Sequence, residues 1–460
     1  VAAFEKKDWA TAREAFEAVL PAIMAALAQA PDRDQAIARF DNMIEMMSSA
    51  INVFRLLEAR PALLQLVADI LSYAPTLAEA LGRNSEYLDA LIDSSAMDLP
   101  GETADLIAAM TARAAGADYQ LLLDHVRAFV GEKRFALGVQ LIEGRNDALD
   151  IAGSYAHLAE AALSVLTQAT ITEFEKAHGK VLGGELVILA LGRLGGEALT
   201  HASDLDVVLL FTGEFGTESD GARPLGATQY FNRLAQRVVA SLTVPTASGQ
   251  LYEIDTRLRP SGGDGLLCAS IDSFALYQRE SAWTWEHMAL TRARCVYGSP
   301  AARTEVDAII HDVLSNPRDT AKLHADVVQM RRDMAAHKPP KGELDVKLLP
   351  GGLVDLEFIV HALQLETHQA LHPQLGKAVA DLITAGKLPP EFADAYAVLG
   401  KLLVLVRLVT PDCDSPPEPA QALIAKSLGY DNWIDAKTAI KHFRHVVIAQ
   451  WEQLFGPRDF

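Results

Sequence analysis

The chain has little cysteine, with three such residues in 460. Cys268, Cys295 and Cys413 lie far apart and are odd in number, and none of them has the short paired spacing of a zinc site or a disulfide framework. We therefore expect reduced thiols and a cytoplasmic protein, because disulfides persist mainly in oxidising compartments.

Positive charge is also scarce. Lysine and arginine number 41 against 60 aspartates and glutamates, which gives a formal net charge of -19 and an isoelectric point near 5.1. Such a surface repels phosphate backbones and anionic lipid, so nucleic acid is a poor candidate partner. No stretch approaches the roughly eighteen consecutive apolar residues of a membrane span, and the N-terminus lacks a basic region followed by an apolar one. We expect no membrane association.

Aromatic residues make up only 7% of the chain, while alanine and leucine abound, which favours a helix-rich fold. A chain of 460 residues exceeds what one hydrophobic core usually serves, so several domains are expected. The sequence begins with Val1 rather than methionine and opens in a helical pattern, which indicates a piece of a longer polypeptide. We predict a helical N-terminal domain over residues 1–125, a central α+β domain over 126–300 and a helical C-terminal domain over 301–460.

Helical periodicity dominates both flanks of the chain. Apolar residues recur at helical spacing behind Pro61, a residue suited to a first helical turn. Further helical stretches cover residues 119–139 and 155–174, and the chain is helical again after Pro300. Loops are expected over 338–352 and 411–419, where Lys, Pro and Gly gather.

The period changes only in the centre of the chain. The runs 185–191 and 205–211 are short and apolar, as buried strands are, and glycines bound the first of them. Residues 230–242 return to helical spacing, and residues 251–258 alternate again. The centre therefore predicts the order strand, strand, helix, strand, in a small mixed sheet.

Two carboxylates mark the second of these strands. In LGRLGGEALTHASDLDVVLLF, Asp204 and Asp206 alternate with apolar residues, so both project from one strand face. Asp255 projects from the strand LYEIDTRLRP and can join them. Carboxylate oxygens suit Mg²⁺ together with substrate phosphates, and like charges so close are costly without a cation. Three carboxylates on two strands suit a two-metal clamp that transfers a phosphoryl group to a hydroxyl.

Glycines precede the two aspartates. Gly195 and Gly196 would let backbone N–H groups approach nucleotide phosphates with no Cβ in the way, and Ser203 is a candidate to assist. An Asp-x-Asp pair alone is more often the solvated face of an edge strand that follows a glycine turn. Here the glycine pair, the alternating aspartates and a later strand with an outward aspartate coincide. Together they match the nucleotidyltransferase signature of the polymerase-β type.

Four segments in order, GRLGGEALTHASDLDVVLLF, SGQLYEIDTRLRPSGGDGLL, AWTWEHMALTRARCVYG and GGLVDLEFI, resemble the glutamine synthetase adenylyltransferase family. Its members carry two related halves, one that adds AMP to a tyrosine of glutamine synthetase and one that removes it by phosphorolysis. Glu253 in YEIDTRLRPSG and the run Trp283–His287 resemble the adding, C-terminal half. The resemblance implies a polymerase-β-like nucleotidyltransferase domain at 126–300 with ATP and Mg²⁺ as cofactors. It also implies glutamine synthetase as protein substrate, a PII signal protein as partner and glutamine as a candidate effector.

The resemblance also implies roles for single residues. Asp204, Asp206 and Asp255 match the catalytic, metal-binding aspartates of the family. Three glycines and a serine match its nucleotide-binding loop: Gly192, Gly195, Gly196 and Ser203. This chain departs from the family at Glu197 and Ala198, where a basic residue and then a glutamate are usual, and at Arg193, where lysine is common. The function of the altered loop stays open.

Arginines and tryptophans near these motifs allow two interpretations each. Arg257 and Arg259 can grip phosphate or form salt bridges on an acidic protein, and the salt-bridge interpretation is favoured for Arg292 and Arg294. Trp283 and Trp285 can cover a purine, although two tryptophans in an apolar helix are more often core.

The segment after Pro350 carries further polar residues. Asp355 is expected to stabilise a helix start through the helix dipole. Lys347, Asp355 and Glu357 match residues typical of the family, which suggests that this loop and helix end pack against the site. His368 and His372 are four residues apart, but no third metal ligand is near them.

Three functions are consistent with these motifs. The first is Mg²⁺-dependent transfer of AMP from ATP to glutamine synthetase, and the second is the phosphorolytic removal of AMP by the related half. The third is a non-catalytic module that binds glutamine synthetase or a PII protein. The intact triad of Asp204, Asp206 and Asp255 argues against the third.

Overall fold

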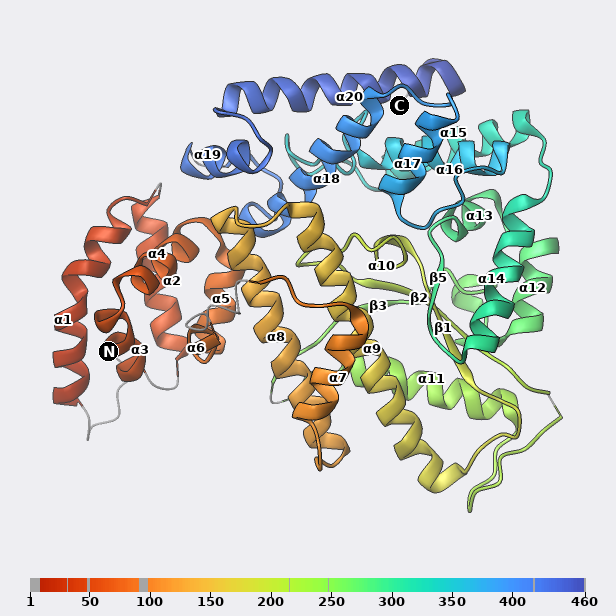
Figure 1. The fold of residues 1–460 in the computed structure, drawn as a ribbon, viewed down its shortest axis with the longest axis horizontal. Coiled ribbons are helices and arrows are strands. Elements are labelled where there is room, and N and C mark those ends of the chain that lie inside the picture. Colours follow the sequence, from red (N-terminus) through yellow and green to blue (C-terminus); the bar gives the residue numbers. More distant parts are fainter. Residues whose placement is uncertain are drawn as a thin grey trace.

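The computed structural model describes residues 9–30, 32–47, 50–90, 98–214, 216–246, 248–416 and 418–458. Helices flank one small mixed sheet, which confirms the α+β class in its broad form (Figure 1). The start of the chain at Val1 lies outside the described residues. No helix among the described residues is both long and apolar enough to cross a membrane.

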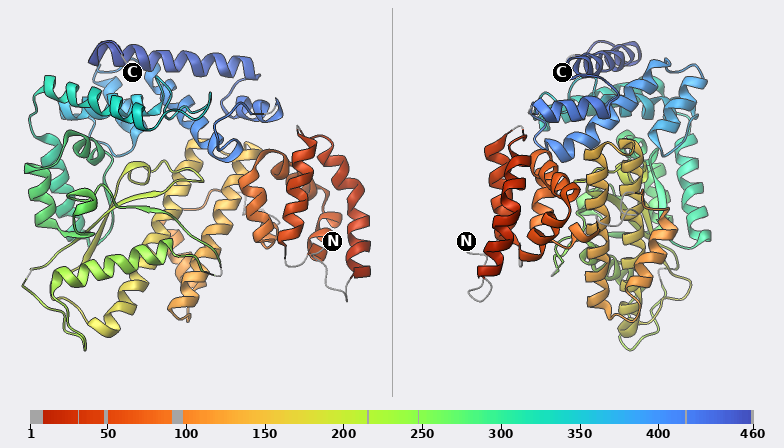
Figure 2. Two further views of the ribbon diagram at one scale, coloured as in Figure 1. Left: turned by 180° about the vertical axis from the view of Figure 1, so that it is seen from behind. Right: turned by 60° about the vertical axis from the view of Figure 1, so that its left-hand side comes forward.

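The N-terminal helices lie side by side at one end of the molecule (Figures 1 and 2). Pro61 and Pro75 occupy first helical turns, where the N–H group that proline lacks would have no partner. The helices are α1 (Trp9–Leu27), α2 (Arg33–Met46), α3 (Ala50–Ala59), α4 (Pro61–Tyr73), α5 (Pro75–Arg83) and α6 (Tyr87–Ala90).

Two long helices connect this end to the sheet. After α7 (Thr103–Arg113), helix α8 (Tyr119–Glu143) begins at Asp118, whose carboxylate caps the N–H of Leu121, and ends at a left-handed glycine. Helix α9 (Ala148–His178) contacts α8, α11 and β5. Its apolar residues are buried on most sides, so α9 is a central support of the fold.

The sheet contains β1 (Leu186–Ala190), β2 (Leu205–Phe211), β3 (Ile254–Asp255), β4 (Cys268–Ser270) and β5 (Arg294–Tyr297). Strand β1 pairs antiparallel with β2 and β5, whereas β2 pairs parallel with β3 at its start and with β4 at its end. The first two expected strands are confirmed. The strand expected over 251–258 is much shorter, because the Asp255 carboxylate accepts the N–H of Arg257 and turns the chain.

Helices cover the sheet and lead away from it. The expected helix over 230–242 is α11 (Ala227–Thr243), and its Phe231 stacks on Phe211 of β2 with ring centroids 4.7 Å apart. Strands β4 and β5 escaped the sequence analysis because they are only three and four residues long. Helices α12 (Ile271–Glu280) and α13 (Thr284–Leu290) lie between them in the chain.

The C-terminal segment is helical, as expected; α14 lies beside α12, and the later helices lie along the top of the molecule in Figure 1. Residues 338–352 form the predicted loop before α16. The helices are α14 (Pro300–Ser315), α15 (Thr320–His337), α16 (Leu353–Thr367), α17 (Leu375–Thr384), α18 (Glu391–Val409), α19 (Glu418–Ser427) and α20 (Trp433–Phe455). Among the described residues, strands occur only between 186 and 297.

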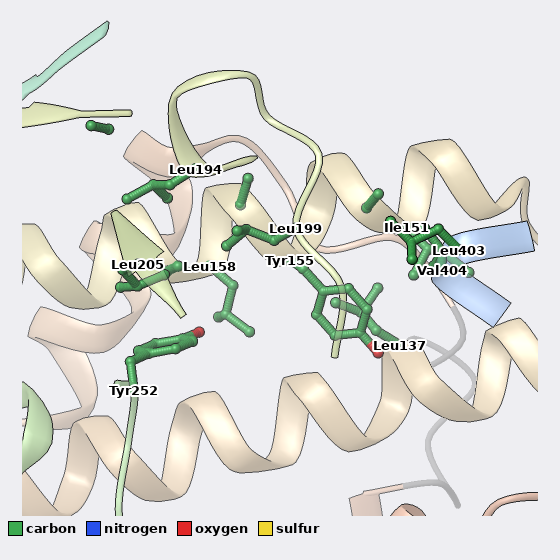
Figure 3. Close-up of a cluster of buried hydrophobic side chains, with 14 of the residues drawn as sticks. Leu137, Ile151, Tyr155, Leu158, Leu194, Leu199, Leu205, Tyr252, Leu403 and Val404 are labelled. Carbon is green, nitrogen blue, oxygen red and sulfur yellow. The ribbon is translucent and has the colours of Figure 1, made fainter. Parts of the chain in front are cut away.

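A hydrophobic core fixes the segment that precedes β2. Short helix α10 (Gly192–Gly195) leads into this segment, and Figure 3 shows Leu194 and Leu199 directed toward α9, with Leu205 beside Leu158. All four side chains are fully buried. The polar residues at 200–204 are therefore anchored by apolar side chains on both sides of them in the chain.

Candidate active site

Asp206 and Asp255 occupy matching positions in the parallel ladder of β2 and β3. Asp204 lies two residues before Asp206, at the mouth of β2. One carboxylate oxygen from each of the three lies within 4.8 Å of the others. The structure thus brings together the three aspartates that the strand pattern placed on one face. We call Asp204, Asp206 and Asp255 the carboxylate cluster.

Burial and neighbouring charges shift the pKa values of two members of the carboxylate cluster. Burial, and then the charges of Asp204 and Asp255, raise the pKa of Asp206 to about 6. Asp255 behaves differently, because hydrogen bonds from Arg257 hold the pKa of its carboxyl below the usual value. Oxygen-only ligands with this much negative charge are the donor set that hard divalent cations such as Mg²⁺ prefer. The residues present therefore fit such a cation.

Gly192 lies against Asp206. Its φ is +55°, and a Cβ there would stand 2.1 Å from Asp206 Oδ2. A side chain at this position would be strained and would displace the carboxylate. Glycine at 192 is thus required by the close approach of the chain to the carboxylate cluster.

Gly195 and Gly196 serve close packing in this structure. A Cβ on Gly195 would stand 2.0 Å from the Arg292 carbonyl oxygen, and one on Gly196 would stand 2.6 Å from an Arg292 guanidinium nitrogen. Their own N–H groups donate to Leu191 and Gly192. Only the N–H groups at the very start of this turn lack an intrahelical acceptor. Phosphate binding by the turn stays a prediction. The N–H groups at the start of the turn are better candidate donors to a phosphate than those of Gly195 and Gly196.

Ser203 closes the turn before the carboxylate cluster. Its Oγ accepts the N–H of Thr200 at 2.9 Å and lies 2.9 Å from the Thr200 hydroxyl. Side chains of this kind commonly fix tight turns. Ser203 therefore positions Asp204 through the backbone, and its predicted contact with nucleotide stays untested.

The arginines divide into two groups. Arg257 is exposed and pairs with Asp255 at the carboxylate cluster, while Arg259 donates to the carbonyl oxygens of Thr256 and Gly263, at 3.0 and 3.2 Å, and so holds its own loop together. The favoured salt-bridge interpretation holds for the other two. Arg292 donates to Glu357, and Arg294 pairs with Glu160 and Glu197.

Glu357 is a site residue whose partners the sequence analysis did not identify. Its Oε1 lies 3.0 Å from Arg292 Nη1 and 3.7 Å from Arg193 Nη2. Burial alone would raise the pKa of Glu357, but Arg292 and Arg193 lower it below the usual value. Arg193, Arg292 and Glu357 form what we call the ion cluster, which ties α16 to the glycine turn. The expectation that this helix end packs close to the site is supported.

Asp355 lies in the first turn of α16, as the capping interpretation expects, but that interpretation is incomplete because two arginines also pair with it. Asp355 is completely buried in α16, and its oxygens accept from Arg331 at 2.5 Å, from the Gly351 N–H at 2.6 Å and from Arg458. It joins α15, α16 and the C-terminal end of the chain. A first-turn position in sequence cannot distinguish a solvated acid from a buried one, since the partners are distant in sequence.

The core interpretation of the two tryptophans is wrong. Trp283 is 71% exposed and Trp285 36%, because α13 is short and its start faces solvent. Both line a groove of about 600 Å³ together with Met288 of α13, four residues of α15 and the residue that follows α15: Asp326, Met330, Asp333, Met334 and Lys338. The charge of Lys338 also helps to lower the pKa of Asp255.

Within the part of the chain that the structure describes, neither His368 nor His372 belongs to a group of three or more metal-ligating side chains. His368 Nδ1 lies 3.2 Å from the Leu314 carbonyl oxygen. Among the described residues, the carboxylate cluster is the group of three or more metal-ligating side chains that is close enough to hold an ion.

Two family models match the chain. The model described as glutamate-ammonia ligase adenylyltransferase matches residues 64–309, more than half of the chain. The model described as GlnD PII-uridylyltransferase matches residues 321–455. The first match contains the carboxylate cluster and the glycine turn, and the second contains Lys347, Asp355 and Glu357.

The name of several similar proteins states two activities. A bifunctional glutamine synthetase adenylyltransferase/adenylyl-removing enzyme of Brucella suis is 39% identical over 85% of this chain and 40% of its own length. Proteins of the same name from Agrobacterium fabrum and Rhodopseudomonas palustris are 38% and 37% identical, over 90% and 98% of this chain and 43% and 47% of theirs. The chain thus spans less than half the length of these relatives.

Proposed function

Because this chain belongs to the glutamate-ammonia ligase adenylyltransferase family, we propose that it transfers AMP from ATP to a tyrosine hydroxyl of glutamine synthetase. The observation that carries the proposal is the carboxylate cluster, in which the oxygens of Asp204, Asp206 and Asp255 lie within 4.8 Å of one another. Three charged carboxylates at one point need a cation, and a cation beside phosphates is the common requirement of nucleotidyl transfer.

In the proposed reaction the tyrosine oxygen bonds to the α-phosphorus of ATP, and the bond to the bridging oxygen of the β-phosphate breaks. The products are a phosphodiester on tyrosine and pyrophosphate, and the hydroxyl proton leaves to solvent. Magnesium ions held by the carboxylate cluster would supply the positive charge that stabilises the transferring phosphoryl group. The chain orients the cluster: Arg257 fixes Asp255, and the absence of a side chain at Gly192 leaves room for Asp206.

Further features of the proposal follow the family. We assign residues 126–300 to a polymerase-β-like catalytic domain, with helical domains at 1–125 and 301–460. The exposed faces of Trp283 and Trp285 are available to cover a purine. A PII signal protein is proposed as a partner, since the C-terminal helices match a model for a PII-modifying enzyme.

The adding direction is proposed over removal on the motifs SGQLYEIDTRLRPSG and AWTWEHMAL. The named relatives combine both activities in one longer chain, so the direction needs a direct test. The chain is incubated with ATP labelled at the α-phosphate, Mg²⁺ and glutamine synthetase, and the protein is examined for label. Label that depends on Mg²⁺ and is lost on phosphodiesterase treatment supports the proposal. Absence of label at saturating ATP contradicts it.

A further inference from the structure

Lys347 is fixed beside the start of α16 by backbone hydrogen bonds. The N–H of Val354 donates to the Lys347 carbonyl oxygen at 3.1 Å, and the N–H of Leu353 donates to that of Val346 at 2.8 Å. This part of the loop is therefore a defined turn. The fold therefore sets the position of this turn, and of Lys347, relative to α16.

The ion cluster brings the same helix end to the glycine turn. Glu357 lies one helical turn beyond Val354, and it pairs with Arg193 and Arg292. Arg193 directly follows Gly192, where an added Cβ would meet the Asp206 carboxylate. A continuous series of contacts thus joins the helix beside Lys347 to the carboxylate cluster.

Lys347 has no close partner for its charge. It is largely buried, yet no ion pair within 4.0 Å involves it among the described residues. The charged groups that act on it from neighbouring elements are Arg193, Glu357, Arg407 and Asp204, and its charge in turn acts on Asp206. A buried ammonium without a partner is costly, so such a position is typical of a group that binds an anion.

The local charge favours an anionic ligand. Arg193, Arg292 and Lys347 contribute three positive charges, and Glu357 contributes one negative charge within this group. Arg292 also has a buried Nε without a hydrogen-bond partner among the described residues. The excess of positive charge stands next to the carboxylates. A ligand that is both metal-binding and anionic, such as a polyphosphate, suits this arrangement.

We propose that Lys347 binds the phosphate chain of the nucleotide, and that the C-terminal helical segment thereby completes the active site. This inference rests on the proposed function, since it takes ATP as the ligand. Lys347 then holds the departing pyrophosphate portion, while the carboxylate cluster serves the transferring end. Asp206 and Lys347, which serve the two ends of the phosphate chain, are about 140 residues apart in the sequence.

Substitution of Lys347 tests the inference through binding rather than through turnover. Affinity for ATP and, separately, for inorganic pyrophosphate is measured by calorimetry with Mg²⁺ in the wild type and in Lys347→Met, Lys347→Gln and Lys347→Arg. We expect the Met and Gln variants to bind both ligands roughly ten- to a hundredfold more weakly, as loss of a charge-assisted hydrogen bond predicts. The Arg variant should regain part of the affinity. Lys341→Met is the matched control, because Lys341 is an exposed lysine of the same loop.

Each result bears on the inference separately from the proposed function. Unchanged affinity in a folded Met or Gln variant, or an equal loss in Lys341→Met, would overturn the inference. Gln is included because it retains polarity if the Met variant unfolds, and thermal unfolding establishes which variants are folded. Affinity that depends on Lys347 without label on glutamine synthetase would leave the inference standing and the proposed function wrong. A wild type that binds neither ligand refutes both.

Discussion

Asp206 and Asp255 face each other across the parallel ladder of β2 and β3. Neighbouring strands are about 4.8 Å apart, so the ladder itself forces the two carboxylates together. Asp204 adds a third at the same edge. The fold therefore holds negative charges close together, and burial makes this arrangement more costly. Such a local cost in stability is expected at a site that binds a cation.

Removal of one carboxylate should abolish transfer and preserve the fold. We expect Asp204→Asn and Asp206→Asn each to lower AMP transfer by at least roughly 10²–10³-fold, because electrostatic stabilisation of the transition state is lost. Labelling of glutamine synthetase at saturating Mg²⁺ measures this, and circular dichroism monitors the fold. Asp272→Asn, at an exposed acid in the first turn of α12, is the control. Unchanged turnover in either cluster variant would end the metal proposal.

The raised pKa of Asp206 predicts a stability effect with a definite sign. Its folded pKa of about 6 exceeds the usual 3.8, so its contribution to stability is present at low pH and is lost as pH rises through about 6. Without divalent cations at pH 7.5, Asp206→Asn should therefore be more stable than the wild type, on the order of 3 kcal/mol. Urea unfolding at several pH values measures the difference, which should shrink below pH 4.

The same charge governs the response to Mg²⁺. A metal ligand must be deprotonated, so Mg²⁺ should stabilise the wild type more at pH 7.5 than at pH 5, and it should hardly stabilise Asp206→Asn. Equal Mg²⁺ stabilisation of the two proteins at pH 7.5 would show that the ion binds elsewhere.

Local pattern was sufficient for the central strands and for the carboxylate cluster. The runs 186–190 and 205–211 are continuous apolar segments with turn residues beside them, and a two-residue period places alternate aspartates on one face. Asp255 could be included because its strand also alternates. These features depend only on neighbours in sequence.

Features that depend on distant residues could not be predicted. Arg292 and Glu357 are 65 residues apart in the chain, and Asp355 pairs with Arg458, which is 103 residues away. Nothing in the local sequence distinguishes these buried pairs from solvated charges. The exposure of Trp283 likewise results from where α13 begins, on a surface that other elements leave open.

Gly192→Ala should damage the site by displacing Asp206. Its φ of +55° and the 2.1 Å approach of a Cβ to Asp206 Oδ2 force the carboxylate to move. Displacement of a catalytic group by about 1 Å can lower the rate roughly 100-fold, so we expect a loss of this order in AMP transfer. Gly226→Ala is the matched control, since a Cβ there meets open space. Wild-type turnover in Gly192→Ala would show that the site tolerates the shift.

Asp355→Asn should destabilise the fold far more than loss of an ordinary helix-start acid. Arg331 and Arg458 would face an uncharged group in a buried position, a change that typically costs about 3–5 kcal/mol. Asp394 also lies in a first helical turn but is exposed, so Asp394→Asn should cost roughly 0.3–1 kcal/mol. Urea unfolding of both variants gives the comparison. Equal small effects would show that the pairs with Arg331 and Arg458 add little to the interaction of Asp355 with the helix dipole.

This chain should add AMP to glutamine synthetase and should not remove it, even with phosphate in excess. The carboxylate cluster can stabilise the same in-line transition state with pyrophosphate or with phosphate as the other partner. Discrimination must then come from residues around it, such as Glu253, Arg257 and Trp285. Among the described residues there is one such cluster, and one site predicts one activity.

The decisive measurement presents the chain with glutamine synthetase that already carries labelled AMP, together with phosphate, and follows the release of labelled ADP. The forward assay with labelled ATP runs in parallel at the same Mg²⁺ concentration. A failure of metal binding would therefore abolish the signal in both assays. Label transfer without ADP release supports the adding half. Rapid ADP release without label transfer would assign the chain to the removing half, and it would mean that the motifs around Glu253 and Trp285 do not determine direction.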